Sequence, residues 1–452
     1  MSSEDSSHLI PNTEEDRKEM LSVIGVESFE ELLSNVPQEL LNADFSDLGK
    51  GLSEYEVLEL LKGLANGNVS SNEAVSFLGG GAYDHFVPSI IGEIISRSEY
   101  LTAYTPYQAE VSQGTLQAIF EYQSMICALT GMDVANASMY DGASALAESG
   151  LLACGHTKRN KLVVASTVTQ AYRDVVKTYI QGSDIELVFV PFENGVTDIE
   201  ALSSLVDAQT AAVMLQTPNF FGCIEDAEEA GKIARENGSL FIVSADPISL
   251  GILKKPGEYG ADIVVGEGQS LGTPTQFGGP YLGIFAAKMN LIRRMPGRIA
   301  GQTWDLDGNR GYVLTLQTRE QHIRRERATS NICTNQGIVM LSAAIYMSIM
   351  GKEGIYKVAE LSTQKSHYLA EQINELSGFE VMFGSPFFKE FVVKTPVDPS
   401  KIIESLLEEN IFAGIDLSGF DYGIDNGLLI CVTEKRTKEE MDRFVELLGG
   451  VS

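Results

Sequence analysis

An aspartate and a serine occupy two positions at which the chain could do cofactor chemistry. Asp246 directly follows an apolar stretch, residues 240–245, that is typical of a buried strand. Ser270 follows a second such stretch, residues 262–265. In many pyridoxal-phosphate (PLP) enzymes an aspartate pairs with the pyridine nitrogen and a lysine carries the Schiff base. The aspartate is present and the lysine is not, so the chain either needs no PLP or depends on a lysine from another chain.

Three other lysines are candidates for the missing Schiff-base residue. Lys254 and Lys255 precede Pro256 in an expected loop, where paired lysines are usually solvated. Lys288 follows the expected strand 281–285, further along the chain than a strand-end lysine. An independent PLP enzyme that uses one of these lysines stays open as an alternative.

The order of the expected elements predicts a mostly parallel α/β sheet covered by helices. A helix over residues 227–236, capped by Asp226 and closed by Gly238, precedes one of the strands. Ligands of such sheets bind at the carboxyl ends of the strands. We therefore expect Asp246 and Ser270 to line one cleft. The expected strands are residues 161–165, 186–190, 211–215, 240–245, 262–265 and 281–285.

The helical pattern changes along the chain and divides it. Near the start, helices are expected at residues 29–35 and after Ser53, whose spacing to Glu56 is that of a capping box. Further on, an apolar helix is expected over residues 337–350, followed by a second helix to about residue 376. We predict three parts: a helical arm (residues 1–75), a large α/β domain (76–335), and a linking helix with a small C-terminal α/β domain (336–452).

The composition excludes several classes of partner. The 452 residues include 33 basic and 62 acidic side chains, a net charge of −29 that argues against nucleic acid and anionic membrane as main partners. The five cysteines form no C-x-x-C pair, and the five histidines are too dispersed for a metal site. The N-terminus is acidic and polar, without the apolar stretch of a signal peptide. We expect a cytoplasmic protein.

Two polar features allow a structural and a functional interpretation. His85 follows a glycine-rich loop and is either a functional group or a loop histidine bonded to Asp84. A group of arginines can bind a phosphate, a carboxylate or an acidic partner, or it forms a solvated helix face. Its members are Arg293, Arg294, Arg298, Arg319, Arg324, Arg325 and Arg327.

Longer motifs resemble one known family. Residues 77–88 (FLGGGAYDHFVP), 102–108 (TAYTPYQ) and 328–336 (ATSNICTNQ) are similar to blocks in the N-terminal half of the glycine cleavage system P protein. The similarity extends over nearly the whole chain apart from its start. In many organisms the P protein is one long chain with two homologous halves, and this chain resembles the lysine-less subunit of the split form. Further similar blocks are residues 112–117, 129–133, 136–143, 277–280 and 318–322.

The resemblance implies a fold and an activity. The fold is that of the PLP-dependent transferases of fold type I, like aspartate aminotransferase, whose dimers place active sites at the subunit interface. The resemblance places PLP on a lysine-bearing partner, the second P-protein subunit, rather than on this chain. The complex would decarboxylate glycine on PLP and transfer the aminomethyl group to the lipoyl group of the H protein. It would be a glycine dehydrogenase (aminomethyl-transferring), active only with both subunits, and the alternative is a scaffold that only stabilises the PLP-bearing partner.

The resemblance also implies which residues contribute. Ser270 falls on the lysine position of the other half, so no catalytic residue is certain in this chain. Asp246 falls on the pyridine-partner position and is the candidate cofactor contact, with a turn aspartate before Pro247 as the alternative. Gln170-Ala171 departs from the His-Pro expected in relatives. Glycine-rich aromatic loops suit close approach to a ligand and equally suit packing between subunits. The active-site candidates in these loops are His85, Tyr104, Tyr107, Asn136, Tyr140 and Asp141.

Overall fold

The computed structural model describes residues 11–41, 49, 51–70, 73–276 and 278–451. The chain divides into two compact units, Met1–Val69 and Ser70–Ser452. The division of the second unit into a large and a small domain at residue 335 stays a prediction.

The first unit is helical, as the sequence predicts. The capping box of Ser53 and Glu56 is confirmed, with the Glu56 carboxylate accepting from the Ser53 N–H at 2.8 Å. The predicted helix 29–35 is too long, because the helix ends at Leu32 and Leu33, its C-cap, leaves the helical conformation with φ −96° and ψ 15°. The helices are α1 (Glu14–Ile24), α2 (Phe29–Leu32), α3 (Gln38–Leu41) and α4 (Glu54–Ala65).

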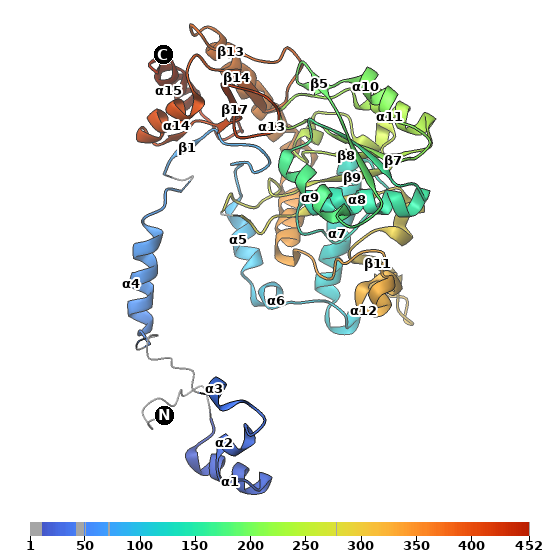
Figure 1. The fold of residues 1–452 in the computed structure, drawn as a ribbon, viewed down its shortest axis with the longest axis vertical. Helices are drawn as coiled ribbons and strands as arrows, with labels where there is room; N and C mark the ends of the chain where they lie inside the picture. Colours follow the sequence, from blue (N-terminus) through green and yellow to red (C-terminus); the bar gives the residue numbers. More distant parts are fainter. Residues whose placement is uncertain (1–10, 42–48, 50, 71–72, 277, 452) are drawn as a thin grey trace. The chain divides into compact units, whose positions relative to one another are not determined.

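A seven-stranded sheet in the order β2-β10-β9-β8-β7-β3-β4 organises the second unit (Figure 1). The mostly parallel sheet is confirmed: β3, β4, β7, β8 and β9 are parallel, and β10 is antiparallel to β9. The strand predicted at residues 281–285 begins later, because the Leu282 N–H donates to the Glu267 side chain. The strands are β2 (Val134–Ala135), β3 (Lys161–Ala165), β4 (Glu186–Val190), β7 (Thr210–Gln216), β8 (Leu240–Ser244), β9 (Ile263–Glu267) and β10 (Gly283–Ala287).

The strand order reverses between β3 and β7. Helix α9 (Gln170–Ile180) leads from β3 outward to β4, and α11 (Ala227–Glu236) leads from β7 in the other direction to β8. Because such crossovers are right-handed, α9 and α11 cover opposite faces of the sheet. Helix α8 (Gly142–Thr157) packs across β7 to β10. Ligands of doubly wound sheets bind at the carboxyl ends beside such a reversal.

Helix α13 (Gly337–Asn374) contains both helices predicted between residues 337 and 376. Gly351, with a φ of 57°, breaks it where the sequence analysis separates them. It packs on α7 (Gln113–Thr130) and continues to the C-terminal strands. Among the described helices, α13 is long and apolar enough to cross a membrane, but half of its apolar window is buried in the fold, as in the core helix of a soluble protein.

The C-terminal lobe carries a four-stranded sheet in the order β13-β14-β17-β16. A separate apolar core, including Phe77, Phe391 and Phe444, fills it. Strand β1 (Val75–Ser76) pairs with β15 (Ile411–Phe412), which fastens the start of the second unit to this lobe. Its other elements are β13 (Glu380–Val381), β14 (Glu390–Lys394), β16 (Ile415–Asp416), β17 (Gly427–Cys431), α14 (Pro399–Glu408) and α15 (Lys438–Gly449).

A hairpin of β11 (Ile299–Trp304) and β12 (Arg310–Thr315) is an element that the sequence pattern does not predict. Its turn is held by the Asp305 carboxylate, which accepts the Asn309 N–H at 2.7 Å. The remaining elements include α5 (Ser89–Ile95), α6 (Ser98–Leu101), α10 (Ile199–Leu205), α12 (Gln321–Arg324), β5 (Phe192–Glu193) and β6 (Val196–Thr197).

Candidate functional site

A cavity of about 30 Å³ lies at the carboxyl ends of the parallel strands. Asp246, after β8, is among its lining residues, as the sequence analysis expects. Ser270 instead lies buried, 3% exposed, and its Oγ has no hydrogen-bond partner within the described part of the chain. The lining from the strand ends includes Gln216, Ser244, Asp246 and Glu267, and the remainder includes Tyr83, Thr169 and Glu390.

Asp246 has an ion-pair partner from the C-terminal lobe. The Lys389 Nζ lies 2.7 Å from the Asp246 Oδ2, and the side chains are 1% and 9% exposed. The same ammonium lies 3.4 Å from the centroid of the Tyr83 ring, a cation–π contact. The carboxylate that the sequence analysis assigns to a pyridine nitrogen therefore already binds a cation of its own chain.

His85 contacts the lysine of this ion pair and connects it to a second carboxylate. Its Nε2 lies 2.9 Å from the Lys389 Nζ, and its Nδ1 lies 2.5 Å from the Glu434 Oε2. Because an ammonium only donates, Nε2 accepts, and Nδ1–H donates to Glu434. His85 is thus held in the interior, 4% exposed. The suggested bond to Asp84 is wrong, since the Asp84 carboxylate pairs with Lys435 at 2.6 Å.

Glu390 follows Lys389 and lies beside the same cavity. Its Oε1 accepts the Gly80 N–H at 2.6 Å, and its Oε2 accepts the Tyr83 hydroxyl at 2.8 Å. Burial raises the pKa of the Glu390 carboxyl to about 7, against these bonds and the Lys389 charge. The carboxyl therefore changes its charge near neutral pH.

The substitution Glu390→Gln is expected to make stability less dependent on pH. With a folded pKa of about 7 against an ordinary value of 4.5, Glu390 holds a proton in the folded chain that the unfolded chain releases. Its contribution to stability is complete below about pH 4.5 and is lost as the pH rises through 7, a change on the order of 3 kcal/mol. From pH 5 to 8 the melting temperature should fall more steeply in the wild type than in E390Q.

The exposed control Glu404→Gln should show the same dependence of melting temperature on pH as the wild type. Parallel curves for E390Q and the wild type would contradict the assignment of a raised pKa to Glu390.

Glu267, at the end of β9, occupies the N-terminus of α8. Its Oε2 accepts the Gly142 N–H at 3.0 Å, and its Oε1 accepts the Leu282 N–H at 2.8 Å. Asp141, a predicted site residue, caps the same helix by accepting the Ser144 N–H at 2.7 Å. Helix N-termini attract anions, phosphate groups above all, and here two carboxylates of the chain fill that role.

The residues around Asp246 do not fit PLP. A cavity of about 30 Å³ has room for roughly one water molecule, whereas small-molecule sites enclose about 300–1,000 Å³. Asp246 is paired with Lys389, and the hydroxyl of Ser270 cannot supply the primary amine of a Schiff base. The assignment of Asp246 as a cofactor contact stays a prediction that this geometry disfavours.

A second group of predicted residues meets around Arg298, away from that cavity. The Arg298 guanidinium donates to the Asn335 Oδ1 at 2.9 Å and to the Cys333 carbonyl at 2.7 Å, and it lies 5.8 Å from the Tyr107 ring centroid. The Tyr140 hydroxyl accepts the Cys333 N–H at 3.4 Å. Tyr140 therefore contacts the motif of residues 328–336 directly, whereas Tyr107, from a separate loop, contacts the Arg298 guanidinium that donates to this motif.

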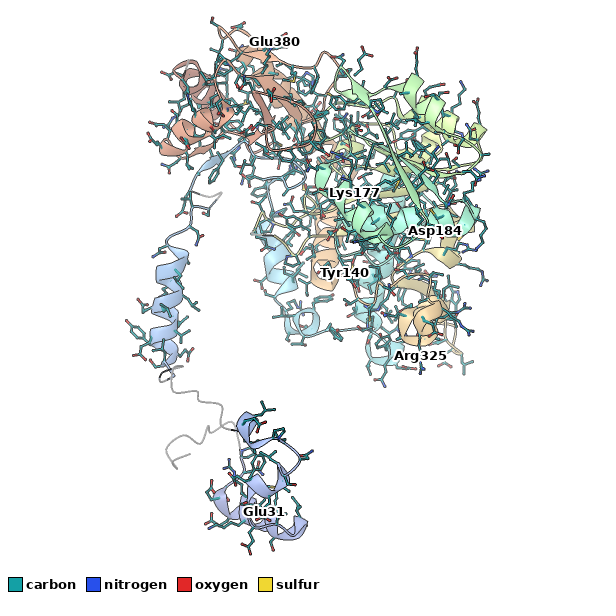
Figure 2. All side chains as sticks on the ribbon, viewed as in Figure 1. Glu31, Tyr140, Lys177, Asp184, Arg325 and Glu380 are labelled. Carbon is teal, nitrogen blue, oxygen red and sulfur yellow. The ribbon has the colours of Figure 1, made fainter. Side chains whose placement is uncertain are left out.

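The other predicted site residues differ in how far they are buried. Asn136 is buried, and its amide donates to the Pro296 carbonyl at 3.0 Å, so it supports the loop that carries Arg298. Tyr104 is 85% exposed. In Figure 2 Tyr140 lies among crowded side chains, whereas Arg325 lies near the margin of the molecule. The arginine group is divided accordingly: Arg298 and Arg319 are buried, and Arg324, Arg325 and Arg327 are exposed.

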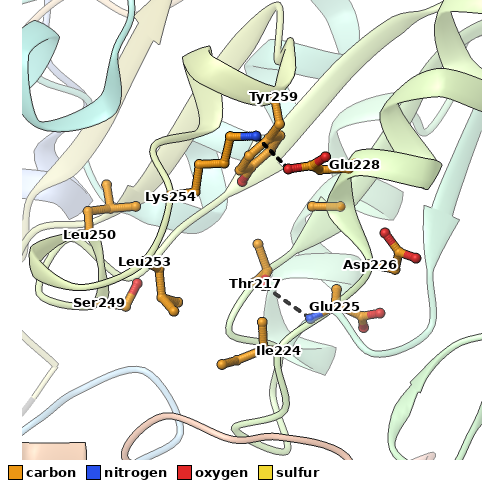
Figure 3. Close-up of a pocket in the computed structure, with 11 residues that line it drawn as sticks. Thr217, Ile224, Glu225, Asp226, Glu228, Ser249, Leu250, Leu253, Lys254 and Tyr259 are labelled. Atoms are coloured by element: carbon orange, nitrogen blue, oxygen red, sulfur yellow. Dashed lines mark hydrogen bonds and ion pairs between the residues drawn. The ribbon is translucent and has the colours of Figure 1, made fainter.

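A larger pocket, of about 240 Å³, is lined by Lys254 but by none of the predicted active-site loop residues (Figure 3). It lies at the N-terminus of α11, where the Lys254 Nζ lies 2.5 Å from the Glu228 carboxylate.

The other two candidate lysines also have partners within the chain. Lys255 donates to the Ala128 carbonyl, and Lys288 pairs with Asp262. These three lysines therefore have partners away from Asp246, which removes the geometric support for an independent PLP enzyme that uses them.

Lys389 and Glu434 are the site residues that sequence reasoning missed. The available signal was the run Phe387-Phe388-Lys389-Glu390-Phe391, in which two charges interrupt an aromatic stretch at the start of a strand. Charged residues in such a position are seldom buried without partners. The pattern indicates a buried ion pair but does not identify Asp246 as its other half.

Comparisons with known proteins agree over nearly the whole chain. The family model described as glycine cleavage system P-protein matches residues 7–448. A relative from Chloroherpeton thalassium, called probable glycine dehydrogenase (decarboxylating) subunit 1, is 58% identical over 97% of this chain and 98% of its own. A relative of the same name from Chlorobaculum tepidum is 56% identical over 98% and 99%.

Solved structures confirm the fold. The crystal structure of a glycine decarboxylase (P-protein) of the glycine cleavage system, in inhibitor-bound form, is 43% identical with a TM-score of 0.91 and covers 98% of this chain and 99% of that chain. A sphingosine-1-phosphate lyase from Burkholderia pseudomallei has a TM-score of 0.66 at 14% identity, covering 89% and 91%, and it indicates fold alone. The fold is fold type I of the PLP-dependent transferases, as the resemblance implies.

Proposed function

Because this chain belongs to the glycine cleavage system P-protein family, we propose that it is the lysine-less subunit of a cytoplasmic, heteromeric glycine decarboxylase. The relatives' name, glycine dehydrogenase (decarboxylating) subunit 1, identifies it as a subunit of that enzyme and implies a second subunit. The observation that carries the proposal is the cleft around Asp246. Ser270 occupies the position at which a Schiff-base lysine is expected, and the Lys389 side chain closes the cleft by pairing with Asp246.

In the proposed complex the second subunit supplies the Schiff-base lysine and binds PLP. PLP held there would supply the electron sink for the decarboxylation of glycine, and the lipoyl group of the H protein would receive the aminomethyl unit. This chain contributes no group to that electron flow. Its part is to bind the second subunit and to line the outside of that subunit's cleft.

The aromatic loop at residues 102–108 supports this proposed role in binding the second subunit. Tyr104 is 85% and Tyr107 50% exposed, although both rings are largely apolar. The Tyr107 ring contacts His322 edge-on at 5.4 Å, which joins the loop to α12, and both lie toward the lower edge of the second unit in Figure 1. Exposed aromatic side chains that are fixed by contacts with neighbouring residues are typical of protein interfaces.

A scaffold without contact to substrate is the second candidate. The closed cleft favours it, because His85 and Asp246 both have buried partners within the chain. The two candidates differ in what the exposed tyrosines do after assembly, since only the first requires them for turnover.

Reconstitution tests the proposal. The purified full chain is expected to release no CO2 from carboxyl-labelled glycine with lipoylated H protein and PLP, and to release it once the lysine-bearing subunit is added. The spectrum of the lone chain with PLP, followed by borohydride trapping and peptide mapping, is the control. Labelled CO2 from the lone chain, or a trapped adduct on Lys389, would show that this chain carries its own cofactor.

A further inference from the structure

The cavity at the carboxyl ends of the sheet has two polar contacts that a charged ligand would satisfy. At one, the Asp246 carboxylate meets the Lys389 ammonium, and at the other, the N-terminus of α8 meets the Glu267 carboxylate. We propose that these side chains hold the places of a ligand's ring nitrogen and phosphate, so that the chain folds with its cofactor cleft permanently filled. The inference concerns this chain alone and does not depend on the proposed complex.

The cationic contact is complete. An ammonium has three N–H donors, and Lys389 directs them to the Asp246 Oδ2 at 2.7 Å, the His85 Nε2 at 2.9 Å and the face of Tyr83. A protonated ring nitrogen would offer Asp246 the same charged N–H donor. Since Lys389 is 1% exposed, no free ligand can reach that carboxylate unless the lysine leaves.

The contact at the N-terminus of α8 is also complete. Glu267 accepts the Gly142, Gln269 and Leu282 N–H groups at 3.0, 3.1 and 2.8 Å. The Gly142 N–H lies at the N-terminus of α8, and the other two come from the segments after β9 and before β10. Backbone N–H groups that converge in this way beside a helix N-terminus form an anion-binding arrangement. Tyr172 closes the same end, because a Cβ on Gly142 would lie 2.3 Å from the Tyr172 hydroxyl oxygen.

The filled cleft fastens the C-terminal lobe to the sheet. Lys389 lies directly before β14 of that lobe, whereas Asp246 ends the segment after β8. Nearby, the Tyr422 hydroxyl accepts the Gln170 N–H at 2.8 Å, at the position of the Gln-Ala departure, and Arg173 forms a forked ion pair with Asp421. A cleft held shut by these bonds gives a fixed surface and has no internal space for a mobile substrate.

Small probes test each contact separately in the full chain. Lys389→Ala should lower the melting temperature, and ethylammonium chloride should raise it again by several degrees, because the probe restores a cation beside Asp246. Glu267→Ala should gain stability from inorganic phosphate in the same way. Neither probe should stabilise the wild type beyond the effect of sodium chloride at equal ionic strength.

Matched variants control for nonspecific salt effects. Lys288→Ala removes a lysine from the half-exposed pair with Asp262, and ethylammonium should not rescue it. Glu148→Ala removes a buried carboxyl from the middle of α8, and phosphate should not rescue it, since no helix N-terminus is opened there.

The combined variant tests the assignment of both contacts to one ligand. Lys389→Ala with Glu267→Ala should gain a saturable rise in melting temperature from pyridoxine 5′-phosphate, which carries the ring nitrogen and phosphate but no aldehyde to react with surface lysines. Equal stabilisation of the wild type would overturn the inference, as would folded single variants that no probe stabilises. The single variants keep the test decisive if the double variant does not fold, and a failed reconstitution with the second subunit would leave these results unchanged.

Discussion

Asp246→Ala is expected to lower the free energy of unfolding by about 3–5 kcal/mol, because it leaves a buried ammonium without its carboxylate. Lys389 cannot turn toward water, since it is 1% exposed and lies between His85 and the Tyr83 ring. The midpoint of urea unfolding of the full chain measures the loss. Such a loss of stability is larger than expected if Asp246 were only a turn aspartate before Pro247.

A double substitution distinguishes an unpaired charge from general damage at the site. Asp246→Asn with Lys389→Met removes both charges and keeps similar volumes, so most of the lost stability should return. The exposed pair of Lys254 and Glu228 is the surface comparison, and Glu228→Ala should change stability by less than about 1 kcal/mol. A D246A midpoint equal to that of the wild type would mean that Lys389 reaches another counter-charge.

The sheet was predictable because its strands are continuous apolar runs. Strands buried on both faces leave that pattern in the sequence, as at β3 and β8, and the helix over residues 227–236 carries its own cap at Asp226. The hairpin of β11 and β12 left no such pattern, because β11 ends in exposed residues and Gly301 and Gly311 interrupt the two strands. Local sequence identifies an element when burial is uniform along it.

The site was less predictable because its partners come from distant segments. Asp246 was found from its place after a strand, but its counter-ion enters from the C-terminal lobe, and no spacing rule connects the two. His85 was recognised as unusual for its glycine-rich surroundings, yet its partners, Lys389 and Glu434, come from that same lobe. Strand ends locate a cleft, whereas the packing of two lobes decides whether the cleft is open.

Ser270 and Lys389 belong to one arrangement. Ser270 removes the amine that would hold a cofactor covalently, and Lys389 satisfies the aspartate that would hold its ring. Without Lys389, the buried Asp246 carboxylate would lack its counter-charge. Function in this chain is then expected on its outer surface, where Tyr104 and Tyr107 remain exposed.

Tyr107→Ala in the assembled complex is expected to lower kcat/KM for glycine about 10-fold or more, equivalent to about 1.4 kcal/mol of transition-state stabilisation. Arg298 and His322 contact the Tyr107 ring, so its exposed side is held in a fixed position, as the proposed contact with a second subunit requires. Labelled CO2 release measures the effect, with size-exclusion chromatography to verify assembly. Tyr356→Ala is the matched control, because it removes a tyrosine of similar exposure (45% against 50%) from α13, and its turnover should match the wild type. Unchanged turnover of an intact Y107A complex would favour the scaffold, since a loop that completes the cleft cannot lose its fixed aromatic ring without effect.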